Sequence, residues 1–310
     1  MSILLAILSL TMLAQTLRTA VPYACAALGG VWSERSGVIN IALEGLLLAS
    51  GLASVIVEHA THSAWWGLLA GAITGAALAA VHAVLVVYGR VDAIVSGIAL
   101  NLMAAGGTRF LLRALYDSSA NSPGIEGFRF KYFNGPSGSM LLVRTFLDPL
   151  TLLALLAMLV TLYVLVATRF GLRVRAAGED PIAAATVGIP VARLRVLAVM
   201  LGGAICGLGG VALAFDQHQF QSGMSGGRGF IALATVILSG WRPVRAVLAC
   251  LVFAALDALQ FVLQGQAAVP HDLVQMLPYV VTLVALGAVG RRGSASAFGR
   301  APAGLGKAAL

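Results

Sequence analysis

The chain consists mainly of long apolar stretches separated by short polar segments. These stretches lie at 3–31, 38–57, 65–88, 93–113, 149–168, 195–215, 229–240, 244–264 and 273–290. About 20 helical residues cover the roughly 30 Å hydrocarbon layer of a bilayer, so most of the stretches are long enough to cross it. They do not alternate with a period of two, which excludes membrane β-strands. The pattern predicts an all-α polytopic membrane protein with about nine transmembrane or re-entrant helices in one bundle.

Two of the stretches depart from a plain single crossing. The stretch 3–31 is too long for one straight helix and contains Pro22, so we expect a kinked or broken helix there. The stretch 229–240 is too short to cross comfortably, and it follows a segment that is rich in glycine: Gly223, Gly226, Gly227 and Gly229. A half-helix or a re-entrant element is predicted at this position.

Lysine and arginine gather in alternate loops, which gives the chain an orientation. If 169–194 is cytoplasmic, alternation places 32–37, 89–92, 241–245 and 291–310 on the same side. Together with Arg195, which directly follows 169–194, these segments hold 13 of the 20 basic residues, namely Arg35, Arg90, Arg169, Arg173, Arg175, Arg193, Arg195, Arg242, Arg245, Arg291, Arg292, Arg300 and Lys307. The bias predicts an N-terminus outside and a C-terminus inside. A double crossing within 3–31 would move only the N-terminus.

Domain organisation follows from the same pattern. Residues 1–290 are expected to form one transmembrane domain, because the apolar stretches leave no room for a separate soluble one. Residues 291–310 are rich in Gly, Ala, Ser and Arg and are predicted to be a flexible cytoplasmic tail. The N-terminus has no Lys or Arg ahead of its apolar stretch, so we interpret it as a retained span rather than a cleaved signal.

Composition narrows the function classes. The chain is 59% hydrophobic and 10% charged, whereas a soluble domain is roughly a quarter charged. The net charge of +8 is explained by basic loops, and no nucleic acid partner is expected. Cys25, Cys206 and Cys250 lie inside apolar stretches and are read as small buried hydrophobes. No catalytic set, metal site or cofactor is predicted, and Gly304–Lys307 lacks the spacing of a phosphate loop, so this chain is not itself an ATPase or another enzyme.

Residues 169–195 form a basic insert between two apolar stretches. Gly178 is expected to end one helix, Asp180 to cap the next and Pro181 to occupy its first position. A short helix of small residues follows, and Gly188 ends it. The pattern predicts either a small exposed helix that fits a groove in another protein or a plain interfacial loop.

The sequence Gly178–Pro190 resembles the coupling segment with which permease subunits of ABC importers contact their ATPase. Residues 34–45, 227–243 and 277–283 are similar to further motifs of the branched-chain amino acid, simple-sugar and nucleoside branch. We call residues 176–190 the coupling segment. The resemblance implies ATPase contacts by Gly178, Glu179, Asp180, Pro181, Ala183, Ala184, Gly188 and Ile189.

The motif Asn40–Gly45 is similar to the nucleoside and simple-sugar subgroup rather than to amino acid permeases. The resemblance implies a bacterial cytoplasmic-membrane permease with three protein partners: a cytoplasmic ABC ATPase, a second and different permease, and an extracytoplasmic substrate-binding protein. The small-molecule cargo is expected to be a nucleoside or simple sugar, with a branched-chain amino acid as the alternative. Gly240–Pro243 departs from the subgroup only in detail.

Polar side chains inside the apolar stretches require a reason, because a charge at mid-bilayer costs about 2.5–3.5 kcal/mol on insertion scales. Spacing places Asn40 and Glu44 on one helix face and gives residues 257, 260 and 264 a polar stripe. We expect a translocation path lined by Asn40, Glu44, Asn101, Asp257 and Gln260. The alternative is interhelical bonding or a buried pair such as Glu44 with Arg35. A stand-alone secondary transporter, in which Asp257 would couple to an ion, stays open as well.

Overall fold

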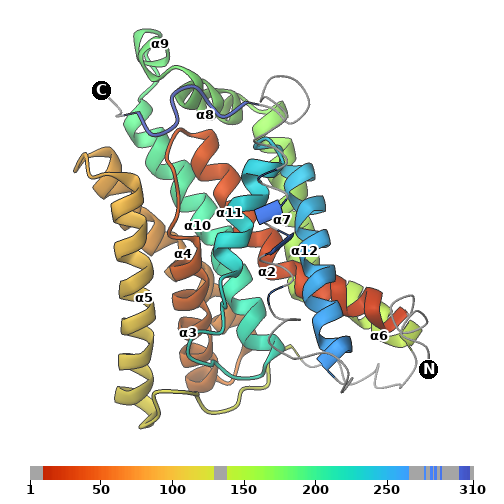
Figure 1. The fold of residues 1–310 in the computed structure, drawn as a ribbon. Coiled ribbons are helices and arrows are strands. Elements are labelled where there is room, and N and C mark those ends of the chain that lie inside the picture. Colours follow the sequence, from red (N-terminus) through yellow and green to blue (C-terminus); the bar gives the residue numbers. More distant parts are fainter. Residues whose placement is uncertain are drawn as a thin grey trace.

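The fold is a bundle of helices, seen in a computed structural model that describes residues 10–128, 138–264, 276, 280, 281, 283, 284, 287 and 300–307 (Figure 1). The helices are α2 (Leu10–Arg35), α3 (Leu43–Thr61), α4 (Ala64–Val87), α5 (Ala93–Tyr116), α6 (Gly138–Leu147), α7 (Pro149–Ala167), α8 (Arg169–Glu179), α9 (Pro181–Thr186), α10 (Val191–Asp216), α11 (Arg228–Leu238) and α12 (Pro243–Gln264). Within these described ranges the only β-type pairing is an isolated bridge between Asn121 and Gln221. The predicted all-α class is confirmed.

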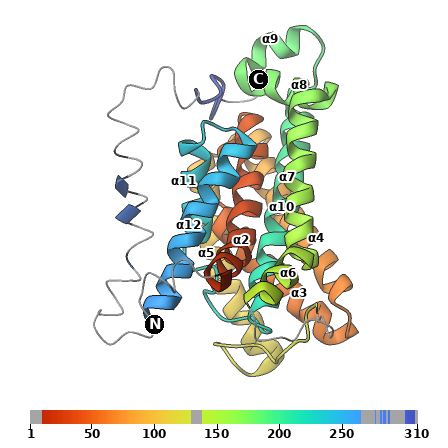
Figure 2. The ribbon, with the colours of Figure 1, turned by 90° about the vertical axis from the view of Figure 1, so that its right-hand side faces the viewer.

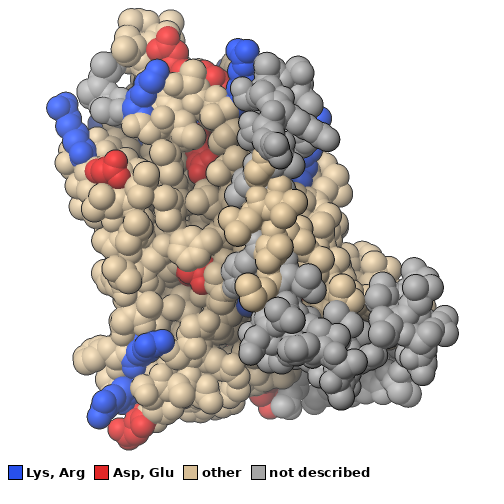
Figure 3. Space-filling view, viewed as in Figure 1, with Lys and Arg blue, Asp and Glu red and all other residues tan. Residues whose placement is uncertain are grey.

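Six of the described helices are long and apolar enough to cross a membrane: α3, α4, α5, α7, α10 and residues 243–260 of α12. On the face shown in Figure 3 most charged side chains lie towards the two ends and few lie between them, as a membrane-embedded bundle requires. The chain is therefore a multi-pass membrane protein. The number nine stays a prediction, because most of the stretch 273–290 lies outside the described residues.

Helix α2 runs through the middle of the bundle and changes direction along its length (Figure 1). Pro22 lies inside it, and proline cannot donate the backbone hydrogen bond of a regular helix, which is the expected cause of the bend. The kinked first helix is thus confirmed over its described part. From Ala20 to Glu34 every residue of α2 is buried, mainly against α10, α11 and α12.

Glycine allows α4 and α10 to pack backbone against backbone. A Cβ atom added at Gly203 would lie 2.5 Å from the carbonyl oxygen of Gly75, and one at Gly207 would lie 2.6 Å from that of Gly71. Both distances are too short for any side chain. Close backbone approach of this kind is a general means of holding membrane helices together, since lipid provides no hydrophobic drive.

The bundle has two ends, which we name after the helices that lie there. Helices α8 and α9 extend beyond the bundle at the α9 end, while α6 and the turn between α3 and α4 lie at the opposite α6 end (Figures 1 and 2). The segments 36–42, 88–92 and 239–242 all lie at or run from the α9 end. This is the grouping that the basic residues predict.

Two connections determine where the interior polar groups lie. After α2 reaches the α9 end, the segment 36–42 runs back into the bundle before α3 begins (Figure 1). Helix α11 has only 11 residues and begins inside the bundle after a turn in which Gly223, Gly226 and Gly227 have positive φ. The predicted half-helix is confirmed as a short helix, and its first residues meet the first residues of α3.

Residues 300–307 belong to the predicted tail. They lie against the α9 end, where the backbone N–H of Gly304 donates to Gly178 O at 2.8 Å and that of Gly306 donates to Gly37 O at 3.0 Å. This part of the tail is therefore packed. The domain boundary at residue 290 stays a prediction, since residues 288–299 lie outside the described part of the chain.

Candidate functional site

The first turn of α11 is held by a carboxylate from α3. Glu44 Oε1 accepts the backbone N–H of Gly227 at 2.7 Å, and Glu44 Oε2 accepts that of Gly229 at 2.7 Å. The first N–H groups of a helix have no partner inside the helix and carry partial positive charge, so a carboxylate satisfies both needs. Gly229 is required by space, because a Cβ atom there would lie 2.4 Å from the backbone nitrogen of Glu44.

A second carboxylate binds the same turn from the other side. Asp257 Oδ2 on α12 accepts the Tyr23 hydroxyl at 2.9 Å and forms an ion pair with Arg228 Nη2 at 3.1 Å. The guanidinium of Arg228 also lies over the Tyr23 ring, 5.8 Å from its centroid. Asp257 is buried. The start of α11 therefore connects α2, α3 and α12 through paired charges and hydrogen bonds.

A polar groove leads from this turn towards the α6 end. It is lined by α2, the end of α10 and the following loop, with Gln15, Arg18, Thr19, Asp216, Gln217 and Arg228 among its residues. Arg18 forms an ion pair with Asp216 across it. Side chains that can form hydrogen bonds therefore line the groove up to Arg228, the first residue of α11.

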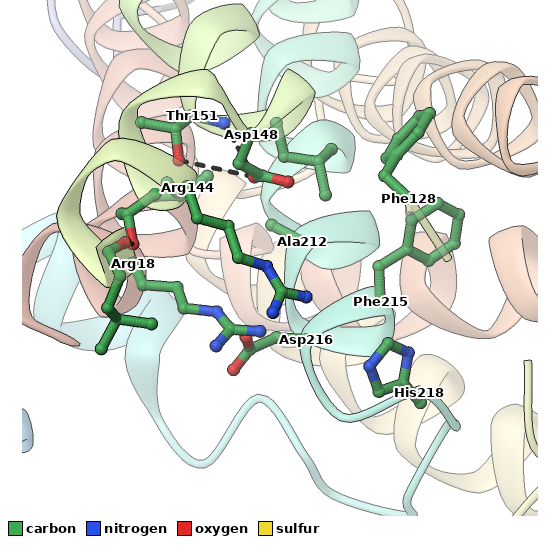
Figure 4. Close-up of a pocket in the computed structure, with 13 residues that line it drawn as sticks. Arg18, Phe128, Arg144, Asp148, Thr151, Ala212, Phe215, Asp216 and His218 are labelled. Carbon is green, nitrogen blue, oxygen red and sulfur yellow. Dashed lines mark hydrogen bonds and ion pairs between the residues drawn. The ribbon is translucent and has the colours of Figure 1, made fainter. Parts of the chain in front are cut away.

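A second pocket adjoins the groove at Arg18 and Asp216 (Figure 4). Arg144 of α6 points into it beside Arg18, and His218 lies on its other side. Asp148 caps α7 by accepting the backbone N–H of Thr151 at 3.2 Å. Burial raises the pKa of the Asp148 carboxyl, and this outweighs the lowering by its hydrogen bonds and by Arg18.

The structure places the predicted path residues in two groups. Glu44 and Asp257 meet at the start of α11, as described above, and Gln260 is half-buried on α12. Asn40 is fully buried and bonds locally, to Ser33 Oγ and the backbone N–H of Ala42. Asn101 accepts the backbone N–H of Gly45 and donates to Ile41 O. The two asparagines thus support the start of α3 rather than the groove.

The alternative pairing of Glu44 with Arg35 is wrong. Arg35 instead donates to the backbone oxygen of Trp241 and lies 3.9 Å from Glu179. Sequence reasoning missed Arg228 and Tyr23, since Arg228 reads as an ordinary loop residue. The signal that could have found it is the glycine-rich run, which marks a re-entrant turn.

The coupling segment forms the predicted short helix. Asp180 Oδ1 accepts the backbone N–H groups of Ile182 and Ala183, each at 3.0 Å, and Pro181 takes the first helical position. Gly188 ends it at φ +80°. Helix α8 continues one residue past Gly178, to Glu179, and the backbone of Gly178 packs directly against Arg35 O.

Exposure divides the coupling segment into two faces. Ile182 is 59% exposed and Val187 is 75% exposed, although both are apolar. Pro181 and Ala184 are buried and face the bundle. The accessible apolar surface of the coupling segment thus centres on Ile182 and Val187, which sequence reasoning did not single out.

Comparisons with known proteins identify the family of the chain. Residues 12–286 match the family described as "Branched-chain amino acid transport system / permease component". The chain is 35% identical over 298 residues to the guanosine ABC transporter permease protein NupQ of Bacillus subtilis, covering 92% of this chain and 93% of NupQ. It is 36% identical over 280 residues to the nucleoside ABC transporter permease protein NupC of Lactococcus lactis, covering 86% and 87%.

Other relatives extend the comparison. The putative glucose ABC transporter permease protein TsgC13 of Haloferax volcanii is 36% identical over 260 residues, covering 79% of this chain and 75% of TsgC13. Bacillus subtilis and Lactococcus lactis each have a second similar permease, NupP and NupB, both 23% identical to this chain. The match to NupP covers 87% of this chain and 79% of NupP. The match to NupB covers 78% of this chain and 70% of NupB.

Proposed function

The chain belongs to the branched-chain amino acid transport permease family and is a permease subunit of an ABC transporter, and on that premise we propose that it imports nucleosides. The observation that carries this proposal is the similarity to NupQ and NupC along most of all three chains. ATP hydrolysis belongs to a partner subunit. The family assignment replaces the alternative of a stand-alone secondary transporter.

The charges around the groove support an uncharged cargo. Arg228 is paired with Asp257, and Arg18 is paired with Asp216, so neither arginine presents an unpaired charge. The carboxylate of Glu44 is occupied by two backbone N–H groups. The remaining polar groups that line the groove are neutral amides and a hydroxyl, from Gln15, Thr19 and Gln217. A nucleoside is uncharged at neutral pH, and its ribose hydroxyls and base edges bond well to such groups.

The two ends of the bundle suit different partners. We place the α9 end in the cytoplasm, because the segments that the sequence predicts on that side, together with Arg195, hold 13 of the 20 basic residues. The ATPase then contacts the exposed face of α9, and the substrate-binding protein approaches the α6 end. NupP and NupB suggest a second, different permease as the partner within the membrane.

Uptake by the reconstituted complex tests the cargo. The chain is placed in proteoliposomes with its ATPase, second permease and binding protein, and ATP-driven uptake of labelled guanosine, glucose and leucine is measured. We expect guanosine to be taken up and to be competed by other nucleosides. Glucose uptake alone would favour the sugar assignment suggested by TsgC13. Leucine uptake alone would favour the alternative that the cargo is a branched-chain amino acid.

A pair of variants tests the proposed ATPase contact. Ile182→Glu with Val187→Glu places charge on the two large exposed apolar residues of the coupling segment, whereas Ile182→Leu with Val187→Ile keeps the surface apolar. The first pair should abolish co-purification of the ATPase, since an apolar contact would then bury an unpaired charge. The second pair should retain it. Equal co-purification of the ATPase with both pairs would show that α9 does not contact it.

A further inference from the structure

The packed part of the C-terminus connects two segments that are far apart in sequence. We call residues 300–307 the strap. Its residue Gly304 donates to Gly178 O, at the end of α8, and its residue Gly306 donates to Gly37 O, in the connection between α2 and α3. Both bonds are made by main-chain atoms, at 2.8 and 3.0 Å. The strap therefore links the coupling segment to the chain that leads into α3.

The fit of the strap on the coupling segment is close. A Cβ atom at Gly304 would lie 2.7 Å from Gly178 O and 2.9 Å from Cδ of Pro181, so this position accepts no side chain. The neighbouring N–H of Ala303 donates to Glu179 Oε2 at 3.2 Å. Pro302 and Gly304 are buried in this contact. The strap thus touches both residues that flank the turn from α8 into α9.

Arg195 holds the same three segments together from inside. It is 2% exposed, and its guanidinium donates to the backbone oxygens of Ser36 at 3.0 Å, Ala177 at 3.2 Å and Lys307 at 2.8 Å. Ser36 precedes α3, Ala177 lies in α8 and Lys307 belongs to the strap. A planar guanidinium offers several donors in fixed directions, which a lysine ammonium does not reproduce.

We infer that Arg195 and the strap position the coupling segment, so that a movement of α9 is passed to the start of α3 as well as to α10. This inference rests on the proposed function. Helix α10 follows the coupling segment directly, but α3 is separated from it in sequence by more than 100 residues. The strap and Arg195 supply that second connection. Through Glu44, the start of α3 in turn holds the first turn of α11.

Displacing the strap tests this role in the complete transporter. Gly304→Val should push the strap away from Gly178 and Pro181, whereas Ala301→Val changes an exposed residue of the same segment. With Gly304→Val we expect the ATPase to co-purify as before, while the ATP hydrolysed per nucleoside imported rises by about 2- to 30-fold, the range over which linking residues change coupling. Ala301→Val should keep the wild-type ratio.

Two further variants keep the test decisive if Gly304→Val does not assemble. Removal of the chain after residue 299 deletes the strap without altering any bundle residue and should raise the same ratio. Arg195→Lys retains the charge but not the three-way contact. It should therefore also raise the ATP hydrolysed per nucleoside imported above the wild-type value.

Different failures have different meanings. A wild-type ratio in an assembled strap-less complex overturns the inference, and so does loss of ATPase binding, since the strap would then be part of the docking surface. If the wild-type complex imports no nucleoside, the proposed function fails instead.

Discussion

The carboxylate of Glu44 gives the sharpest test of the interior site. Its two oxygens each accept one N–H of the first turn of α11, from Gly227 and Gly229, both at 2.7 Å. Glu44→Gln keeps the size and shape of the side chain but turns one acceptor into an NH₂ donor. That donor faces a backbone N–H, so one of the two bonds is lost and the other becomes neutral.

The size of the effect follows from these contacts. A hydrogen bond to a charged group is worth about 1.5–3 kcal/mol, and the favourable position of a carboxylate at a helix N-terminus adds about 0.3–1 kcal/mol. We therefore expect Glu44→Gln to lower the free energy of unfolding by about 3 kcal/mol. The first turn of α11 should loosen, and nucleoside uptake should fall together with stability.

The assay can use the cysteines of the chain itself. Cys25, Cys206 and Cys250 are all buried, so a thiol-reactive fluorogenic dye reports unfolding without any introduced label. The control is Asp117→Asn, which neutralises an exposed carboxylate at the end of α5. If Glu44→Gln melts and transports like Asp117→Asn, the carboxylate does not hold α11 and the reasoning is refuted.

Two further predictions concern space and charge. Gly229→Ala places a Cβ atom against the backbone of Glu44 and should destabilise by about 1–3 kcal/mol, whereas Gly106→Ala, which meets nothing within 4 Å, should be neutral or slightly stabilising in the same dye assay. Because burial raises the pKa of Asp148, its ionised form weakens the fold, so Asp148→Asn should raise the melting temperature at pH 7 while still capping α7. That gain should shrink as the pH falls through the raised pKa and vanish below the ordinary value of 3.8; an equal gain at every pH would contradict it.

Most of the fold could be predicted from the sequence because a membrane leaves few choices. Every backbone polar group in lipid must be satisfied within its own segment, so an apolar stretch of sufficient length is a helix. The stretch 65–88 corresponds to α4 and 149–168 to α7, each within two residues at either end. The short helix of the coupling segment is predictable for a similar reason, since its cap at Asp180 and its end at Gly188 depend on neighbouring residues only.

The interior site was harder to predict because its contacts join distant residues. Glu44 and Gly227 are 183 positions apart, and no period or spacing in the sequence connects them. The sequence does mark Asp257 as a charged residue inside an apolar stretch, which requires a partner. It does not identify Arg228 as that partner. In the sequence Arg228 has the character of a loop residue, since a re-entrant turn and an external loop have the same glycine-rich composition.

The strap shows a different limit of sequence reasoning. Composition predicts flexibility for 291–310 because small residues bury little apolar surface. Yet residues 303–307 are held largely by main-chain donors and acceptors, which every sequence possesses and no composition distinguishes. Glycine at 304 is then an advantage, since only a residue without a Cβ atom lets the strap approach Gly178 so closely. A glycine-rich tail can therefore be flexible in isolation and still fit one narrow position on the folded bundle.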